Sequence, residues 1–251
     1  MGREVDVRLE AELAATPEEV WDAIATGPGI DSWFMGRTEV EPGAGGSVRT
    51  AFGAYDPRLR ISGWEPGEWL AYGGEREADG RFIAYEFLIE GRGRGSTVLR
   101  MVTSGFLPGD DWAEEYESMG FGLALFFRTL IEYLAHFPGR TAAPVTAFGP
   151  PVDDWERAWS ALRGELGLEN RPTAGDKARV ALDGPGPVEG VVYHVSPQTL
   201  GIRAADGLYR FVRGLGGSII AMHHLFSPDA DAAGAERAWS SWLVRIVGEE
   251  R

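Results

Sequence analysis

The sequence of 251 residues contains no cysteine, four histidines and a single lysine, Lys177. Without cysteine the chain has no disulfide, no thiol nucleophile and no thiolate ligand for a metal. No run approaches the ~20 consecutive apolar residues that cross a bilayer, and the acidic, polar start of the chain is unlike a signal peptide. These absences favour a cytoplasmic protein.

Positive charge is also scarce, with 24 Lys and Arg against 38 Asp and Glu and a net charge of −14. Nucleic acids and anionic membranes reward a basic face, so we expect neither as a partner. A composition of 44% hydrophobic and 25% charged residues is typical of a folded protein. The length suits two modest domains.

Catalytic motifs are missing as well. The chain has no G-x-S-x-G and no H-E-x-x-H sequence. The glycines from Gly91 to Gly95 lack the strand-loop-helix context and the Lys-Ser/Thr pair of a phosphate loop, so they indicate a hairpin turn. We therefore expect no nucleotide, no metal and no other cofactor.

The histidines give a weak case for a metal or catalytic site. His223 and His224 are adjacent in a predicted strand and must point to opposite faces, whereas His194 is expected on a neighbouring strand and can approach either. A metal would need further ligands that nothing nearby supplies. The simpler interpretation is one interior and one solvated histidine. His136, at a helix end, suits the helix dipole.

Five acidic residues crowd the expected start of a long helix: Asp110, Asp111, Glu114, Glu115 and Glu117. A paired-carboxylate acid/base site is one interpretation. The favoured one is that acids stabilise a helix N-terminus and are otherwise solvated.

The strongest positive feature is an order of motifs that occurs twice. Pro17–Trp21 and Pro151–Trp155 share the same Pro-to-Trp spacing, and Gly95–Leu99 and Gly217–Ile220 each lead through a turn into an apolar-striped helix. A fixed order used twice indicates a tandem duplication with a degenerate second copy. We expect domains at residues 1–138 and 139–251.

The first half begins with strict alternation over residues 5–13, which predicts a half-buried strand. Thr16, Pro17 and Glu19 then form a capping box that starts a helix. We expect Gly27–Gly29 to break it and a second short helix to carry Ile30, Trp33 and Phe34. Further strands are predicted over 47–52, 58–64, 69–73, 82–89 and 97–106, followed by a helix over about 112–137.

The second half repeats this order without a clear second small helix. A strand is predicted over 144–148, a helix striped by Trp155, Trp159 and Leu162, and a closing helix over 235–247. The intervening strands are predicted over 176–182, 188–195, 199–203, 208–213 and 218–226. Because this copy is shorter, we expect its cavity to be reduced or filled.

Residues 4–137 resemble the START/Bet v1-like (SRPBCC) superfamily, and within it the bacterial relatives of the Aha1 C-terminal domain, an activator of the Hsp90 ATPase. The resembling segments are Thr16–Trp21, Trp33-Phe34, Pro42–Gly46, Gly63–Leu70, Gly95–Leu99 and Gly120-Phe121. The resemblance implies an α+β fold of two tandem helix-grip domains, each an antiparallel sheet wrapped on a long C-terminal helix, with the second copy shortened.

A helix-grip fold implies a cavity between sheet and helix. The expected ligand-binding residues are Trp33, Phe34, Phe52, Tyr55, Trp64, Tyr72, Tyr85, Phe87, Met101, Trp112, Tyr116, Met119 and Phe127. Phe106 is a further candidate, Arg60 and Arg100 are polar candidates, and Trp33 and Phe34 are expected at a gated mouth. Gly120 and Gly122 cost the helix about 1 kcal/mol each, which suggests that sheet or ligand approaches its backbone.

Three functions are compatible with these patterns. The first is binding of a small hydrophobic or amphipathic molecule in the first-half cavity. The second is a protein-interaction, co-chaperone-like module, which needs an exposed apolar patch. The third is a polyketide cyclase-type enzyme, which needs Tyr85, Glu86 or Arg100 to point inward.

Overall fold

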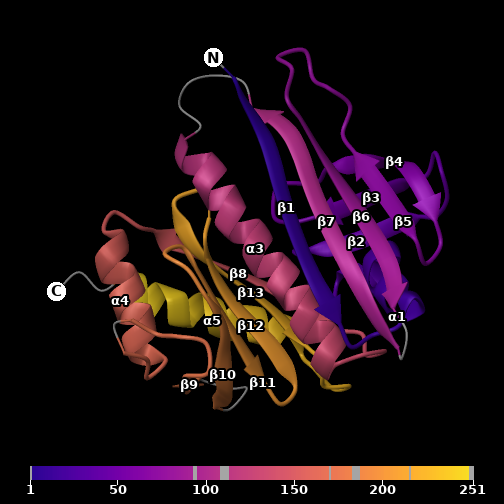
Figure 1. Ribbon diagram of the computed structural model, residues 1–251. Helices are drawn as coiled ribbons and strands as arrows, with labels where there is room; N and C mark the ends of the chain where they lie inside the picture. Colours follow the sequence, from indigo (N-terminus) through magenta and orange to yellow (C-terminus); the bar gives the residue numbers. More distant parts are fainter. Residues whose placement is uncertain are drawn as a thin grey trace. The chain divides into compact units, whose positions relative to one another are not determined.

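The computed structural model describes residues 2–92, 95–107, 113–169, 171–182, 187–214 and 216–248. The chain divides into two units between Thr141 and Ala142, here called the N-terminal unit and the C-terminal unit. Each unit is α+β, with one antiparallel sheet and a helix after its last strand (Figure 1). The predicted fold class of two helix-grip domains is confirmed.

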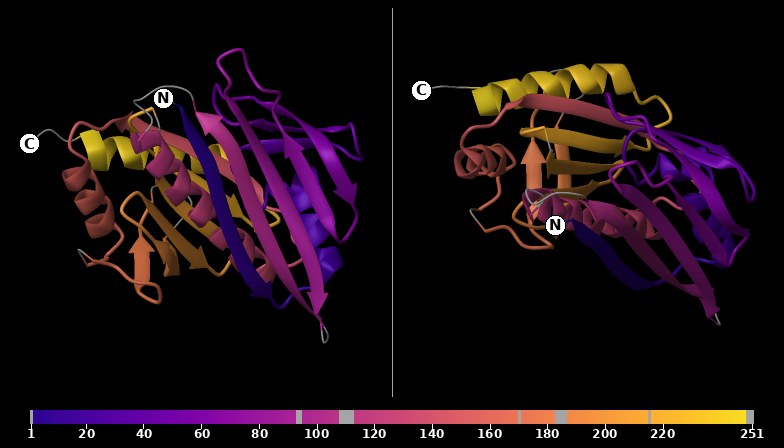
Figure 2. Two further views of the ribbon diagram at one scale, coloured as in Figure 1. Left: turned by 45° about the horizontal axis from the view of Figure 1, so that its top comes forward. Right: turned by 90° about the horizontal axis from the view of Figure 1, so that it is seen from above.

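The N-terminal unit has a seven-stranded sheet in the order β1-β7-β6-β5-β4-β3-β2. Strands β1, β7 and β6 run side by side in every view (Figure 2). Its elements are β1 (Arg3–Leu13), α1 (Pro17–Ala25), α2 (Gly27–Ile30), β2 (Arg37–Glu41), β3 (Ser47–Ala51), β4 (Arg58–Glu65), β5 (Trp69–Gly73), β6 (Phe82–Arg92), β7 (Ser96–Leu107) and α3 (Ala113–His136).

The C-terminal unit has a six-stranded sheet in the order β8-β13-β12-β11-β10-β9. Its elements are β8 (Ala143–Pro151), α4 (Trp155–Glu165), β9 (Lys177–Val180), β10 (Val188–Val195), β11 (Thr199–Ala204), β12 (Gly207–Arg213), β13 (Ser218–Leu225) and α5 (Ala232–Gly248). In both sheets the first strand pairs with the last and the others follow as a meander. The C-terminal unit repeats the topology of the N-terminal unit with one strand fewer.

The start of α1 follows from its sequence. The Thr16 side chain accepts the backbone N–H of Glu19, and the Glu19 carboxylate accepts the backbone N–H of Thr16 at 2.8 Å. Two N–H groups that lack helical partners are thereby satisfied. The predicted capping box is confirmed.

The second small helix differs from the prediction. Gly27–Gly29 begins α2 instead of separating two helices, because Thr26 caps it by accepting the Gly29 N–H and Pro28 supplies a preset φ. The helix ends at Ile30, so Trp33 and Phe34 lie in the turn that leads to β2. Proline here acts as a helix starter.

The closing helix α3 packs against β1 and α1 of its own unit. Its segment Tyr116–His136 is long and apolar enough to cross a membrane by length and composition, with a mean hydropathy of 1.2. The most apolar stretch of this segment is 56% buried inside the protein, as is usual for the core helix of a folded domain.

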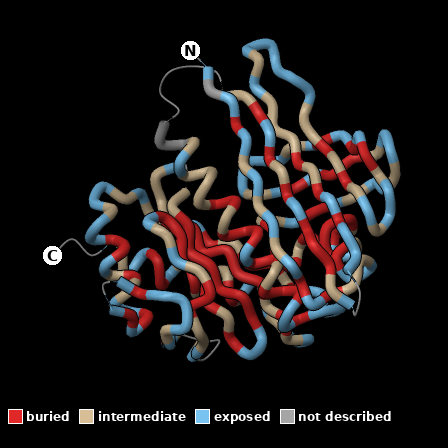
Figure 3. Tube along the Cα trace, in the orientation of Figure 1, coloured by how far each residue is buried: buried red, intermediate tan, exposed pale blue. Residues whose placement is uncertain are grey.

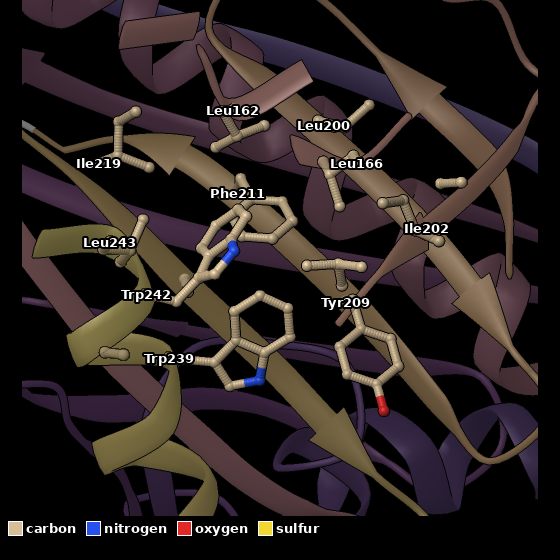
Figure 4. Packing of buried hydrophobic residues seen from close by; sticks show 14 of the residues in the cluster. Leu162, Leu166, Leu200, Ile202, Tyr209, Phe211, Ile219, Trp239, Trp242 and Leu243 are labelled. Atoms are coloured by element: carbon tan, nitrogen blue, oxygen red, sulfur yellow. The ribbon is translucent and has the colours of Figure 1, made fainter. Parts of the chain in front are cut away.

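The core of the C-terminal unit lies between its sheet and the helices α4 and α5. Trp239 and Trp242 of α5 pack their rings against Phe211 of β12, with centroids 5.5 and 5.7 Å away (Figure 4). Leu162 of α4 closes the other side of this core, and strands β12 and β13 are buried along almost their whole length (Figure 3). These contacts order the unit around one aromatic cluster.

Candidate functional site

The inner face of the N-terminal sheet carries buried aromatic and hydroxyl side chains. Tyr72 of β5 lies opposite Tyr85 of β6, and Tyr85 lies opposite Thr103 of β7. Directly opposed residues of an antiparallel pair point to the same face. Tyr72, Tyr85 and Thr103 therefore form a row across three strands, which we call the hydroxyl row.

The hydroxyl row is buried but lacks hydrogen-bond partners. Tyr72 is 5% exposed, Tyr85 8% and Thr103 0%. Among the residues that the structure describes, none accepts from or donates to these three hydroxyls, and Thr103 Oγ1 is fully enclosed. Buried tyrosine and threonine hydroxyls normally find a partner. Because Thr103 Oγ1 is enclosed by protein atoms, the hydroxyls left for a bound polar group are those of Tyr72 and Tyr85.

Burial also keeps the phenols protonated. It raises the pKa of Tyr72 far above the ordinary value, and burial together with the nearby phenols of Tyr72 and Tyr55 raises the pKa of Tyr85. Tyr55 itself is 48% exposed, in the tight turn that joins β3 and β4. Tyr55 is thus half-exposed, whereas Tyr72 and Tyr85 are buried. Each of these protonated phenols can donate a hydrogen bond.

An aromatic cluster fills the part of the interior beside α2. The ring of Phe34 lies 6.1 Å from that of Tyr85 and 4.9 Å from that of Phe126 on α3. Trp33 contacts Phe34 and Phe87, is 1% exposed, and donates its indole N–H to the carbonyl of Ala23 at 2.8 Å. The expectation that Trp33 stands at a mouth is wrong, because its indole anchors the turn to α1.

Open space adjoins α3 close to this cluster. Met119, Gly122 and Phe126 recur at helical spacing and share a face. Gly122 is buried, yet outside its own helix no described atom would lie within 4 Å of a Cβ placed there, and the same holds at Gly120. The sheet therefore does not approach these glycines, and the space beside Gly122 is unfilled by the described side chains.

The other expected site residues fall into two groups. Met101 and Phe127 are buried, and Phe52, Tyr116 and Met119 are half-buried. Trp64 is half-buried and packs edge-on against Trp21 of α1, with centroids 5.0 Å apart. Trp112 lies outside the described residues.

The charged candidates point away from the interior. Arg100 is exposed and pairs with Glu10 and Glu90, Glu86 accepts the indole N–H of Trp69, and Arg60 is exposed between two buried neighbours. Strand alternation places all three on the other face of the sheet, away from the hydroxyl row. Phe106 is likewise held by a surface arginine, Arg76, 6.0 Å from its ring centroid. Of the three residues on which an enzyme interpretation depends, only Tyr85 points inward.

Sequence reasoning missed Asp31, the residue after α2. Its carboxylate accepts the backbone N–H of Thr38 at 2.6 Å, and burial raises its pKa to about 6 against the lowering effects of that hydrogen bond and of Arg37. No periodicity marks an aspartate in a turn. The inward threonine, by contrast, was visible in the alternation that places Thr103 with Met101.

Replacing Asp31 with asparagine is expected to stabilise the N-terminal unit above pH 6. The folded pKa lies above the unfolded value, so ionisation costs the fold more as pH rises from about 4 to 6. Asparagine keeps an oxygen for the Thr38 N–H and carries no charge. Urea unfolding at several pH values should show a gain at pH 7 that disappears near pH 3.5; a gain independent of pH would contradict this explanation.

The histidines are arranged differently from the prediction. His194 on β10 is separated from β13 by β11 and β12, so it is not on a neighbouring strand. His223 and His224 are both 1% exposed, so neither is solvated. The ring of His223 accepts the Arg210 backbone N–H at 3.0 Å, and burial, then Arg210, lowers its pKa to about 3. It is a neutral core residue.

The structure describes only some of the five acidic residues expected at the start of α3. Asp110 and Asp111 lie outside the described residues, as do the side chains of Glu114 and Glu115, while Glu117 is exposed. Within the described part of the chain, no three histidine, aspartate or glutamate side chains gather as a metal site requires.

The C-terminal unit contains a cavity of about 1080 Å³ between α5 and the strand ends of its sheet. Core residues such as Phe211 and Trp239 fill the middle of this unit, so the expected reduction of the cavity applies to the centre and not to this half-open margin. Small alanines on α5, Ala235 and Ala238, leave room that larger side chains would occupy.

Comparison with known proteins finds likenesses in structure only. No protein-family model matches the chain, and no curated protein matches it. DynU16, from the dynemicin biosynthetic locus, is 19% identical over 98% of both chains, with a TM-score of 0.44. The Aha1 dimer from Colwellia psychrerythraea is 19% identical over 52% of this chain and 96% of its own, with a TM-score of 0.41.

A third structure, BH1534 from Bacillus halodurans, is 22% identical and matches 53% of this chain and 99% of its own, with a TM-score of 0.45. Likenesses at this level of identity and TM-score do not define the function of the chain.

Proposed function

We propose that the N-terminal unit binds a small amphipathic molecule between its sheet and α3. The observation that carries this proposal is the space at Gly122, a buried position where a methyl group would have no described atom outside its own helix within 4 Å. Natural interiors are packed to crystal-like density, so unfilled space beside a core helix suggests a place for a ligand.

The polar groups of the hydroxyl row suggest the ligand's chemistry. Tyr72 and Tyr85 offer two protonated hydroxyls, and Met119, Phe127 and the aromatic cluster offer apolar surface. A suitable ligand has an apolar body and a carbonyl, ether or hydroxyl oxygen. Its body would be buried against this apolar surface, and its oxygen would accept hydrogen bonds from the hydroxyls. A fully apolar ligand would leave the hydroxyls without partners.

Two alternative functions have less support. The charged residues expected to serve a cyclase-type enzyme, Glu86 and Arg100, point outward. For an interaction module, the large apolar residues exposed in the described part of the N-terminal unit are Tyr55 and Leu88, on different elements. Single exposed apolar residues are ordinary and form no docking patch.

The topology also supports our proposal about the origin of the chain. The N-terminal unit has the element order of the SRPBCC superfamily, which its motifs resemble in the manner of bacterial Aha1-like domains. The matching strand order of the C-terminal unit supports a tandem duplication. We propose a cytoplasmic ligand-binding protein of this type.

Two substitutions test the proposed site by changing its volume in opposite directions. Tyr85→Ala enlarges the space and removes a donor, and Met119→Trp fills it. We expect each to change the dissociation constant of N-phenyl-1-naphthylamine, measured by fluorescence titration, by at least about fivefold. Met119 is half-buried, so its substitution should shift the thermal midpoint only slightly.

Leu88→Ala is the control, because Leu88 is exposed on the same strand as Tyr85. It should leave probe binding unchanged. If the wild type does not bind the probe, or if all three variants bind it equally well, the N-terminal interior is not a ligand site.

A further inference from the structure

The cavity of the C-terminal unit has a defined wall. It is bounded by α5, by the end of β13 and the loop that follows, and by the turn between β11 and β12. An adjoining cavity of about 400 Å³ shares Leu182, Asp206, Tyr209, Leu225 and Ala235 with it. Because the two share these walls, we treat them as adjoining parts of one half-open groove beside α5, with a volume that suits a molecule of drug-like size.

Tyr209 places a polar atom in this groove. The residue is 6% exposed and lines both parts of the groove. Its hydroxyl has no hydrogen-bond partner among the described residues and points away from the other side chains of the core (Figure 4). A buried tyrosine hydroxyl without a protein partner is available to a ligand.

The charges around the groove are unbalanced. Arg245 is engaged by Glu165 at 3.0 Å, and Asp231 accepts the Gly234 N–H at 2.9 Å where α5 begins. In the described part of the chain, no hydrogen bond or ion pair engages the side chains of the three remaining charged residues of the larger cavity: Asp206, Asp229 and Arg237. Among these three residues, two carboxylates outnumber one guanidinium.

Asp206 also lies close to the buried phenol. Burial first, and then the negative charge of Asp206, raise the pKa of Tyr209. The carboxylate and the hydroxyl can therefore act on the same polar group of a ligand. Around them, Leu182, Leu225, Ala238 and the ring of Trp239 provide apolar surface.

We propose that this groove binds a small organic cation with an apolar or aromatic body. Its ammonium group would lie at Asp206, beside the Tyr209 hydroxyl, and its body would lie along α5. A carboxylate beside apolar and aromatic walls favours such a ligand over a neutral or anionic molecule of the same shape. This site is separate from the one proposed in the N-terminal unit and does not depend on it.

Three probes with one skeleton test the charge preference in the full chain. Calorimetric titration should show 4-phenylbutylamine binding about tenfold more tightly than 4-phenyl-1-butanol, with 4-phenylbutyrate weakest. Asp206→Asn should reduce the amine to the affinity of the alcohol. Asp153→Asn makes the same chemical change at an exposed residue outside the groove and should have no effect.

A second variant locates the binding. Ala238→Trp fills the groove from α5 and should weaken all three probes at least tenfold, with circular dichroism confirming that the unit is folded. Equal affinity of the three probes, or amine binding that survives both Asp206→Asn and Ala238→Trp, overturns the proposal. Neither result bears on the naphthylamine site, which is tested by residues of the other unit.

Discussion

Replacing Gly122 with leucine is expected to weaken binding of N-phenyl-1-naphthylamine at least tenfold while making the N-terminal unit more stable. The Cβ of the new side chain would enter space that the described atoms leave open. Removing a helix-interior glycine also contributes about 1 kcal/mol of helix stability. Function and stability should therefore move in opposite directions, which loss of folding cannot imitate.

A graded series and a matched glycine make this result specific. Gly122→Ala should be stabilising with a smaller loss of affinity, because a methyl group fills less of the space. Gly164 in α4 is also a helical glycine with no described atom near a Cβ, but it is exposed. Gly164→Leu should leave probe binding unchanged. A destabilised Gly122→Leu variant would show that the space is already filled.

Replacing Trp33 with alanine is expected to give the largest loss of stability in the N-terminal unit, about 3–5 kcal/mol. The indole is 1% exposed, packs on Phe34 and Phe87, and donates to the Ala23 carbonyl. Its removal leaves a cavity and frees the turn between α2 and β2. Urea unfolding followed by circular dichroism measures the change.

Trp64→Ala is the comparison, because Trp64 is half-buried and, among the described residues, its ring contacts that of Trp21 alone. Trp64→Ala should lower the free energy of unfolding clearly less than Trp33→Ala does. Equal costs would mean that Trp33 is not the anchor of the turn. Trp33→Phe should recover most of the packing and lose about 1 kcal/mol for the missing hydrogen bond.

The regular elements could be predicted because each is set by local chemistry. Alternation over residues 5–13 gives β1, and the Thr16–Glu19 capping box gives α1. The repeated order of motifs predicted two sheets of one topology. Short-range periodicity and capping carry this information without any knowledge of tertiary contacts.

The errors have two sources, local signals that were misread and tertiary context. Pro28 was expected to break a helix, but a Thr26 cap turned the same residue into a helix start. His194 was expected beside β13, but strand order depends on pairing across the whole sheet, which periodicity does not report. β2 was missed because residues 37–41 have only two buried or half-buried positions, Thr38 and Val40.

The sequence predicted which residue types form the candidate site, but not how they are arranged in space. Alternation places Tyr72 and Tyr85 on one face, but the missing partners of their hydroxyls depend on what packs above them. Asp31 had no signal, since its shifted pKa follows from burial in a turn. Gly122 was singled out by its cost to the helix, and only the structure shows that the space beside it is open.

The central claim is that the space beside Gly122 holds a small amphipathic molecule, and a crystal saturated with 6-bromo-2-naphthol tests it most directly. The account predicts an anomalous bromine peak between α3 and the hydroxyl row, with the naphthalene in van der Waals contact with the Gly122 backbone. Side chains that close over Gly122, with no bromine in the N-terminal unit, would contradict it.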